Sequence, residues 1–306
     1  MRLIHSSVTN AQQENTAEGL LKHIELCGRV AYISEGNITE DSYIRFVDNL
    51  SNLKHYSVFE HGTLYFTIPL VEHEGTLLIE SDKNVLNSPF THIVKDSQNM
   101  YVTTNYRVIV ENSTKDKEGN LVLPKIEKYR VYEPTKHEKR YTFRIVCSNG
   151  IAEQILRHRL FSSTIEDSFS FTKESTRYCN YTKDKFGNQL TYIIPYWTTD
   201  LQEGEWKHEM DIVNLSDKSA IFFMSCENDQ YTYFNLLDCG CDPQQAREVL
   251  PKALKTEMFM TGYISQWKEF LCLRSAKYGA KGVHPDMIVV ADKIYDYFND
   301  NNLLAD

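Results

Sequence analysis

The chain has 306 residues, of which 42% are hydrophobic and 25% are charged, a composition typical of an ordinary globular protein with a sizeable core. It carries 33 lysine and arginine residues against 42 aspartate and glutamate residues, so its formal net charge is −9. A surface of that sign repels phosphate backbones and disfavours binding to nucleic acid or to an anionic membrane, although a local cationic pocket can still hold a small anion.

The sequence shows no sign of export or of a membrane span. Its first ten residues lack the apolar core and cleavage site of a signal peptide, and its apolar runs are far shorter than the roughly 20 residues that cross a bilayer. The seven cysteines are an odd number without a C-x-x-C pair, which disfavours a disulfide framework and a zinc site. We therefore expect a cytoplasmic protein with buried free thiols and no bound metal.

We expect a helix, a strand and then a β-rich stretch along the first half of the chain. Thr39–Asp41 is typical of a helix start, and apolar residues follow at helical spacing as far as Leu53. Thr63–Ile68 is rich in aromatic and β-branched residues and predicts a strand. Between residues 71 and 147 the pattern favours a turn at Lys115–Asn120 and strands at Tyr101–Val110, Glu127–Tyr132 and Tyr141–Cys147. Neither end of this stretch looks like a linker, so we treat it as an elaboration of one domain that spans residues 1–306.

We expect the last third of the chain to be helical. Ser216–Leu237 fits a long helix that ends at Gly240, and Asp242 with Pro243 fits the start of a helix that ends near Pro251. Two further helices are predicted, over Leu254–Leu273 and from His284 onward. Helices at both ends of a β-rich middle favour the α+β class over a regular βαβ succession.

Cationic side chains are concentrated at Arg157, His158 and Arg159, and Glu174–Tyr178 follows with serine, threonine and a further arginine. A guanidinium group binds phosphate bidentately, and hydroxyl groups complete an anion cradle. If Ala152–Arg159 is a continuous helix, its two arginines lie about 200° apart and serve different groups or different subunits, unless the helix ends there. Residue type alone also allows a solvated, charged helix end.

Several segments, in a consistent order along the chain, resemble the flavin-dependent thymidylate synthases. Arg157–Arg159 followed by Ser175 resembles the family signature of R-H-R, seven residues and then S. The other segments that match family patterns are Arg29–Tyr32, His55–His61, Ala246–Pro251, Phe270–Arg274 and His284–Met287. The resemblance implies the α+β fold of that family, in which helices flank a central antiparallel sheet.

The resemblance also implies a reductive methylation of dUMP to dTMP. Methylenetetrahydrofolate would donate the one-carbon unit, FAD would carry the methylene and the reducing equivalents, and NADPH would reduce the flavin. A homotetramer with sites at its subunit interfaces is implied as well. Two alternatives stay open: a flavin- and folate-dependent hydroxymethylation at C5 of dUMP, and a nucleotide-binding homologue that has lost catalysis.

Roles for individual residues follow from the same resemblance. Arg274 and Ser175 are the expected catalytic residues, and Arg274 would lie beside the pyrimidine and favour its ionised N3. The expected dUMP-binding residues are Gln154, Arg157, Glu174, Ser175, Thr176, Arg177, Arg247 and Arg274. The expected FAD-binding residues are Ser57, Arg157, His158, Arg159, Lys173 and Glu269. Without the family, Arg274 also fits a helix-terminal arginine and Arg247 a surface ion pair.

Cys179 follows the motif directly and fits a nucleophile by residue type, because a thiolate attacks the pyrimidine in the unrelated flavin-independent thymidylate synthases. The flavin-dependent family uses no such cysteine, so we expect Cys179→Ser to leave most activity. His158 is a general base by residue type, but the family pattern places it beside the flavin.

The chain departs from the family pattern within the motif. Fifteen residues separate Arg159 from Ser175, where the family has seven. Phe161–Ser168 aligns with Phe169–Thr176 at four identical positions of eight, so we interpret Ser162–Phe169 as a small tandem duplication. We expect this insertion to reshape folate access or substrate choice while nucleotide binding persists. Further departures, which concern the flavin contacts more than the dUMP contacts, lie at Ala31, Lys173, Tyr263, Ser265 and Glu269.

Overall fold

The computed structural model describes residues 1–70, 81–118, 121–159, 169–207 and 215–305, except for the side chain of Arg159. These residues form a mixed structure of helices and mainly antiparallel sheets. The strands are β1 (Arg2–Ile4), β2 (Ser7–Asn10), β3 (Thr63–Pro69), β4 (His92–Lys95), β5 (Asn99–Asn105), β6 (Thr114–Lys115), β7 (Leu121–Val122), β8 (Arg130–Val131), β9 (Arg140–Ser148), β10 (Ser170–Lys173), β11 (Thr191–Ile193), β12 (Gly204–Glu205) and β13 (Lys255–Tyr263).

Helices of both the α and the 3-10 type connect these strands. The α-helices are α1 (Ala17–Arg29), α2 (Ser42–Asn52), α4 (Lys83–Leu86), α5 (Tyr106–Glu111), α6 (Asn149–Leu156), α8 (Asp217–Asp238), α9 (Pro243–Ala246), α10 (Ile264–Arg274) and α11 (Pro285–Asp300). The 3-10 helices are η1 (Val30–Tyr32), η2 (Glu35–Asn37), η3 (Tyr56–His61), η4 (Lys125–Tyr129), η5 (Arg157–Arg159), η7 (Asp184–Phe186) and η9 (Arg247–Val249).

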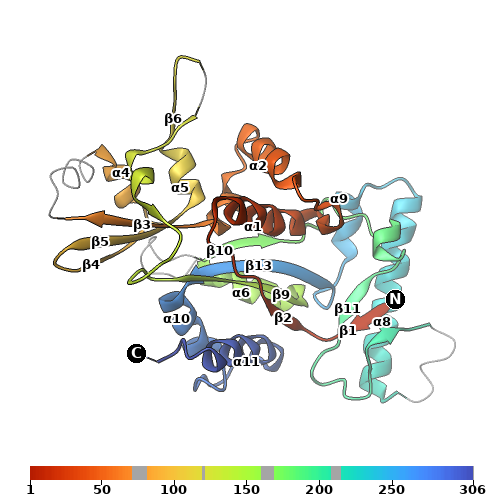
Figure 1. Cartoon of the computed structure of the whole chain (residues 1–306). Helices are drawn as coiled ribbons and strands as arrows, with labels where there is room; N and C mark the ends of the chain where they lie inside the picture. Colours follow the sequence, from red (N-terminus) through yellow and green to blue (C-terminus); the bar gives the residue numbers. More distant parts are fainter. Residues whose placement is uncertain (71–80, 119–120, 160–168, 208–214, 306) are drawn as a thin grey trace.

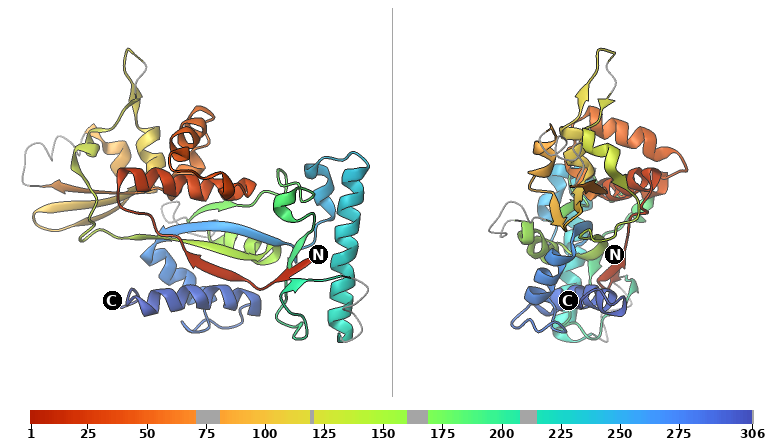
Figure 2. Two further views of the ribbon diagram at one scale, coloured as in Figure 1. Left: turned by 45° about the vertical axis from the view of Figure 1, so that its right-hand side comes forward. Right: turned by 60° about the vertical axis from the view of Figure 1, so that its left-hand side comes forward.

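The central sheet is antiparallel, in the order β10-β13-β9-β2. β13 pairs with β9 from Lys255, opposite Ser148, to Tyr263, opposite Arg140. Its side chains alternate between the two faces, as a strand requires: Met258 and Met260 enter one core cluster, and Phe259 enters another. The helices α1 and α2 lie over one face, and α10 and α11 lie over the other (Figures 1 and 2).

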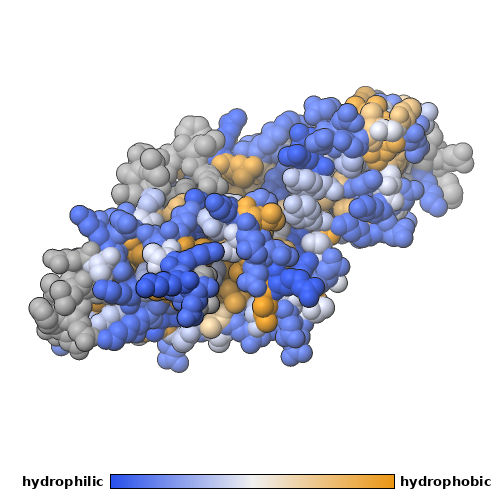
Figure 3. Space-filling view, turned by 90° about the horizontal axis from the view of Figure 1, so that it is seen from above, coloured by the Kyte–Doolittle hydropathy of each residue, from blue (hydrophilic) through white to orange (hydrophobic). Residues whose placement is uncertain are grey.

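Two smaller sheets flank the central one. A second antiparallel sheet, in the order β4-β5-β3-β8, lies at one end of the molecule, and the short sheet β11-β1-β12 lies at the other end beside α8 (Figure 1). The β1–β11 pair is the one parallel pairing within the described ranges. Seen from above, the surface is largely hydrophilic, and hydrophobic residues gather toward the end that carries α8 and α9 (Figure 3).

Most predicted elements of the sequence are confirmed. The helix expected near Thr39–Leu53 is α2, although it begins after Asp41, and strands occupy Thr63–Ile68 and Tyr141–Cys147. The long helix α8 ends before Gly240, whose φ of +93° favours glycine. Asp242 caps α9 in a complete capping box with Pro in the first turn, and α11 begins after His284.

Three predicted elements are wrong in part. Leu254–Leu273 is not one helix, because its first half is β13. Both faces of β13 are largely buried, so its sequence lacks the alternation of a half-exposed strand. Tyr101–Val110 is a strand only as far as Asn105, whose side chain accepts a hydrogen bond from the Val108 N–H at 3.1 Å and thereby caps α5. Glu127–Tyr132 is mainly the 3-10 helix η4, followed by the two-residue strand β8.

The stretch from residue 71 to residue 147 supplies strands to two sheets. Its described part forms β4, β5 and β8 beside β3, but it also supplies most of β9 in the central sheet. The short strands β6 and β7 pair on either side of the predicted turn at Lys115–Asn120, of which residues 119 and 120 lie outside the described part. This stretch therefore runs into the core, and the assignment of one domain to residues 1–306 stays a prediction.

All seven cysteines are free, but only four of them are buried, whereas Cys239 and Cys272 are exposed and Cys241 is partly exposed. The expectation of buried thiols is thus correct for four of the seven. In the part of the chain that the structure describes, no group of three or more histidine, cysteine, aspartate or glutamate side chains is arranged to hold a metal ion. None of the described helices is both long and apolar enough to cross a membrane.

Candidate functional site

The Arg-His-Arg segment lies where α6 ends. Ser148 caps the start of that helix by accepting a hydrogen bond from the Ile151 N–H at 3.3 Å, and the chain tightens into η5 at Arg157–Arg159. Arg157 is exposed at this turn, and the side chain of Arg159 lies outside the described part. The α-helix thus ends at the motif, which is the condition under which its arginines can serve one ligand.

His158 is paired with Arg274. Nε of Arg274, at the end of α10, donates to Nε2 of His158 at 3.0 Å, and the imidazole packs edge-on against Phe270 with ring centroids 4.9 Å apart. Burial, together with the nearby Arg274 charge, lowers the pKa of His158 to about 4. At neutral pH the imidazole is therefore a neutral acceptor that orients a half-buried guanidinium group.

Strand β10 joins the core to the second half of the motif. Phe169, just before this strand, is buried against Trp267 with ring centroids 4.7 Å apart. The ring also lies directly against Gly262 of β13, where a Cβ would meet it at 2.4 Å. Lys173 ends β10 as a partly buried cation, and burial lowers its pKa. It makes no ion pair among the described residues.

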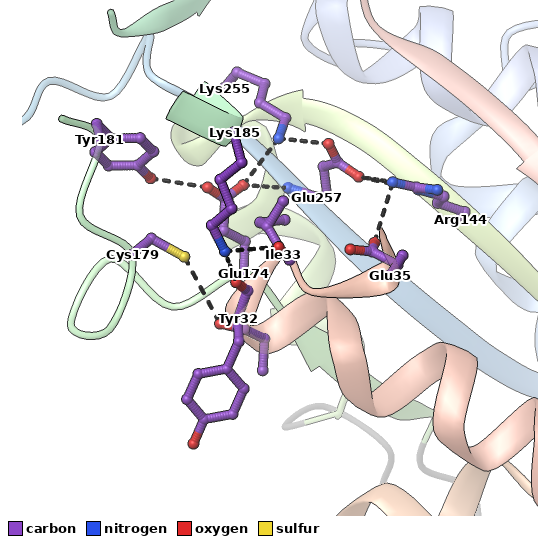
Figure 4. Close-up of polar contacts among 11 residues, drawn as sticks. Tyr32, Ile33, Glu35, Arg144, Glu174, Cys179, Tyr181, Lys185, Lys255 and Glu257 are labelled. Carbon is purple, nitrogen blue, oxygen red and sulfur yellow. Dashed lines mark hydrogen bonds and ion pairs between the residues drawn. The ribbon is translucent and has the colours of Figure 1, made fainter. Parts of the chain in front are cut away.

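Glu174 is buried, and its carboxylate already has three donors (Figure 4). The Tyr181 hydroxyl donates to Oε1 at 2.8 Å, while Nζ of Lys255 and the backbone N–H of Glu257 lie 3.1 and 3.2 Å from Oε2. The backbone N–H of Glu174 also donates to the Glu257 carbonyl at 2.8 Å. The side chain thus faces the interior.

The residues after Glu174 form a turn that rests against η1. The Ser175 N–H donates to the Ala31 carbonyl at 3.0 Å, and Thr176 is partly exposed. Arg177 is exposed; its Nε donates to Oε1 of Gln244 at 3.2 Å, and its guanidinium lies over the Tyr178 ring at 5.2 Å. This turn presents hydroxyl groups and a cation to solvent, which is the composition that an anion needs.

The other predicted site residues lie on separate elements. Arg247 is exposed on η9, with its Nε 3.7 Å from the Glu248 carboxylate. Gln154 lines a cavity of about 200 Å³ together with His284 and Lys252. Ser57, on η3, and Glu269, on α10, are both exposed. The structure therefore brings His158 and Arg274 together, and it joins Glu174–Arg177 to the ends of η1 and α9.

The Cys179 thiol is buried close to Glu174. Burial, with a smaller contribution from Glu174, raises its pKa to about 12. The thiol therefore stays protonated at neutral pH, and a protonated thiol is a poor nucleophile.

Four residues that contact this region were missed by the sequence analysis: Tyr181, Lys185, Lys255 and Glu257. Lys255 and Glu257 are two positions apart, so they point to the same face once the segment is known to be a strand. A helix over Lys255–Glu257 would instead point these two side chains in different directions, so the predicted helix gave no reason to group them. Tyr181 and Lys185 carry no comparable pattern, because Tyr181 lies in a turn and Lys185 in the three-residue helix η7, both too short to show a periodicity.

Comparison with known proteins found a matching family model and similar solved structures. A family model described as "Thymidylate synthase complementing protein" matches residues 88–300. The similar solved structures include the UMP/dUMP methylase PolB from Streptomyces cacaoi, bound with 5-Br dUMP in one structure and with 5-Br UMP in another. Each is 17% identical to this chain with a TM-score of 0.42, and the alignments cover 98% of this chain and 93% and 92% of those chains. No curated protein matches the chain.

Proposed function

The chain belongs to the thymidylate synthase complementing protein family, the flavin-dependent thymidylate synthases, and from this premise we propose that it modifies C5 of dUMP. In its finer form the proposal is a reductive methylation of dUMP to dTMP, with methylenetetrahydrofolate as one-carbon donor and NADPH as reductant. The observation that carries it is the Arg274 guanidinium, held on a neutral histidine of the Arg-His-Arg motif.

In this proposal the nucleotide phosphate is bound by exposed arginines and hydroxyl groups. Arg157 is exposed and makes no ion pair within the described ranges, so its guanidinium group is available to bind a phosphate. Arg177 and the hydroxyls of Ser175 and Thr176 would add donors, with Gln154 and Arg247 from neighbouring elements. Because the chain as a whole carries −9, these cations select a small anion rather than a polymer.

Arg274 is proposed to stabilise negative charge on the pyrimidine ring. A fixed guanidinium favours the ionised N3 and the charge that develops as C5 becomes a nucleophile, and such preorganised groups are commonly the largest single contribution to a rate. His158 assists by orienting Arg274 without adding a second positive charge, since its lowered pKa keeps it neutral. We place Ser175 beside the ring as the second expected catalytic residue.

FAD, when bound, would supply the redox and one-carbon chemistry. The residues proposed to hold it are Ser57, Arg157, His158, Arg159, Lys173 and Glu269. Lys173 fits an acceptor group of such a cofactor, because it is a partly buried cation that makes no ion pair with the described residues. Glu269 is an exposed carboxylate, which fits a hydroxyl of the cofactor better than its phosphates.

The absorption spectrum of the purified protein and the fate of dUMP test this proposal. We expect a yellow protein that releases tritium from C5-labelled dUMP when folate and NADPH are supplied, with dTMP identified by mass. If the product is hydroxymethylated instead, the proposal that the protein modifies C5 of dUMP stands, and the reaction is a hydroxymethylation and not a methylation. A colourless protein that FAD cannot reconstitute, and that releases no label, would contradict an enzymatic role.

Assembly and location complete the proposal. We propose a homotetramer in the cytoplasm with its sites at subunit interfaces, as the resemblance to the flavin-dependent thymidylate synthases implies. Light scattering of the purified protein measures the first point, and fractionation of the source cells measures the second.

A further inference from the structure

Glu174 occupies the position directly before the proposed nucleotide-binding turn Ser175–Arg177, but its carboxylate accepts three hydrogen bonds inside the protein. Its two oxygens accept hydrogen bonds from Tyr181, Lys255 and the Glu257 N–H at 2.8 to 3.2 Å. The side chain is 1% exposed. Because the carboxylate is closed off from solvent and already accepts three hydrogen bonds, Glu174 is better suited to fixing the backbone than to touching dUMP.

Lys255 connects Glu174 to a row of alternating charges across the sheet (Figure 4). Its Nζ lies 2.5 Å from Glu257 Oε1 as well as 3.1 Å from Glu174 Oε2. Glu257 in turn pairs with Arg144 of β9, whose guanidinium lies 3.3 Å from the Glu35 carboxylate. Burial disfavours the charge of Lys255, but the two carboxylates outweigh it and raise its pKa. Lys255 therefore remains a cation between the buried Glu174 and the partly buried Glu257.

A second group of contacts holds the other side of the turn. The Ser175 N–H donates to the Ala31 carbonyl at 3.0 Å, and Nζ of Lys185 donates to the carbonyls of Tyr32 and Ile33 at 2.7 Å each. Ile33 has φ +46°, which is strained for a β-branched residue and needs surrounding contacts to persist. The turn thus lies between a charged anchor on β13 and a strained corner after η1.

We propose that Lys255 and Tyr181 are positioning residues for nucleotide binding, because they hold Glu174 and so fix the Ser175–Arg177 turn at the end of β10. This inference rests on the proposed function, in which that turn binds dUMP. In this role the two residues act through Glu174 and not by contact with the substrate. Their effect is to keep the Ser175 and Thr176 hydroxyls and the Arg177 fork in one arrangement before the ligand arrives.

Two substitutions test the inference. Tyr181→Phe removes one donor from Glu174 and leaves the ring, while Lys255→Met removes the cation. Both are expected to weaken dUMP binding, measured by calorimetry, about tenfold, as the loss of a charge-assisted hydrogen bond predicts. The rate at saturating dUMP should change by less than about twofold. Lys255→Arg keeps the charge and should restore most of the affinity.

Matched controls separate this effect from general loss of stability. Tyr192→Phe removes a buried hydroxyl that donates to the Cys226 carbonyl at 2.7 Å, and Lys136→Met removes an exposed partner of Asp96. Both controls should bind dUMP like the wild type, with thermal melting confirming the fold of every variant. If Lys255→Met fails to fold, the two single variants Tyr181→Phe and Lys255→Arg still test the positioning role, because the first should lose dUMP affinity and the second should keep most of it.

The outcomes separate the two proposals. Folded Tyr181→Phe and Lys255→Met proteins that bind dUMP as tightly as the wild type would overturn the positioning role and leave the proposed function intact. Equal losses in the Tyr192→Phe and Lys136→Met controls would overturn it as well. A wild-type protein that binds no dUMP and releases no C5 label would overturn the proposed function and this inference together.

Discussion

Arg274 and His158 are 116 residues apart in the chain, and Nε of the arginine donates to Nε2 of the histidine at 3.0 Å. The bond joins the end of α10 to the end of α6 and needs an unprotonated Nε2 as its acceptor. Burial lowers the pKa of His158 to about 4, so this condition holds across the neutral range. Two arginine-bearing segments of the proposed site are therefore joined through a neutral group.

This pair predicts an acid-dependent contribution to stability. The folded pKa of His158, about 4, lies below the ordinary 6.5, so the unfolded chain binds more protons between these values and the free energy of unfolding falls as pH drops through that window. His158→Gln should reduce the loss between pH 7 and pH 5 by about 2 kcal/mol, measured by urea unfolding. His23, whose pKa burial also lowers to about 4, is unchanged in both proteins. An identical pH dependence in the two proteins would contradict this assignment.

Substitution of Arg274 should impair the reaction more than the fold. Arg274→Lys keeps a charge but loses the guanidinium Nε that contacts His158, and we expect turnover to fall about 10²- to 10³-fold, as when one preorganised donor is removed. Tritium release from C5-labelled dUMP measures the loss, and thermal melting checks the fold. Arg45→Lys, an exposed change on α2, is the matched control and should retain wild-type activity. Equal activity in both variants would remove Arg274 from the proposed mechanism.

The sequence was sufficient for elements that have local signals. The capping box at Asp242, the stop at Gly240 and the apolar spacing of α2 are each defined by a few neighbouring residues. β13 had no such signal, because a strand buried on both faces has no alternation of polar and apolar residues. The apolar pattern therefore predicts its nine residues as the first half of a helix that continues into α10.

Long-range pairing explains what was missed at the site. The motif pattern located Arg157–Arg159 and Ser175–Arg177, but the donors to Glu174 come from Tyr181 and from β13, about 80 residues further along the chain. The contacts from β13 depend on strand register, and β10 pairs with β13 from Ser170 to Lys173. No local pattern specifies that register. The contact of Arg274 with His158 is also long-range, because it joins the ends of two helices 116 residues apart, and no local pattern predicts it.

Deletion of Ser162–Phe169 should leave the core of the site intact. The deletion joins Phe161 directly to Ser170, so a phenylalanine still precedes β10 and can occupy the buried place of Phe169 against Trp267. Residues 160–168 lie outside the described part, but β10 and the following residues as far as Thr176 belong to the second copy of the duplicated sequence, and Arg177 comes directly after it. We expect dUMP affinity within a few-fold of wild type, measured by calorimetry, while turnover with folate changes. Complete loss of dUMP binding in a folded protein would contradict the duplication hypothesis.

The close approach of Phe169 to β13 depends on Gly262. A Cβ at this glycine would lie 2.4 Å from two ring carbons of Phe169, and the ring is enclosed by Trp267 and Phe270. Gly262→Ala should therefore displace the ring and lower the free energy of unfolding by about 1–3 kcal/mol, as overpacking of a core does. Gly36→Ala is the matched control, because no atom lies within 4 Å of the added Cβ there. Urea unfolding measures the free energy of unfolding of both variants. Equal values would contradict the prediction, because they would show that Phe169 can move without strain.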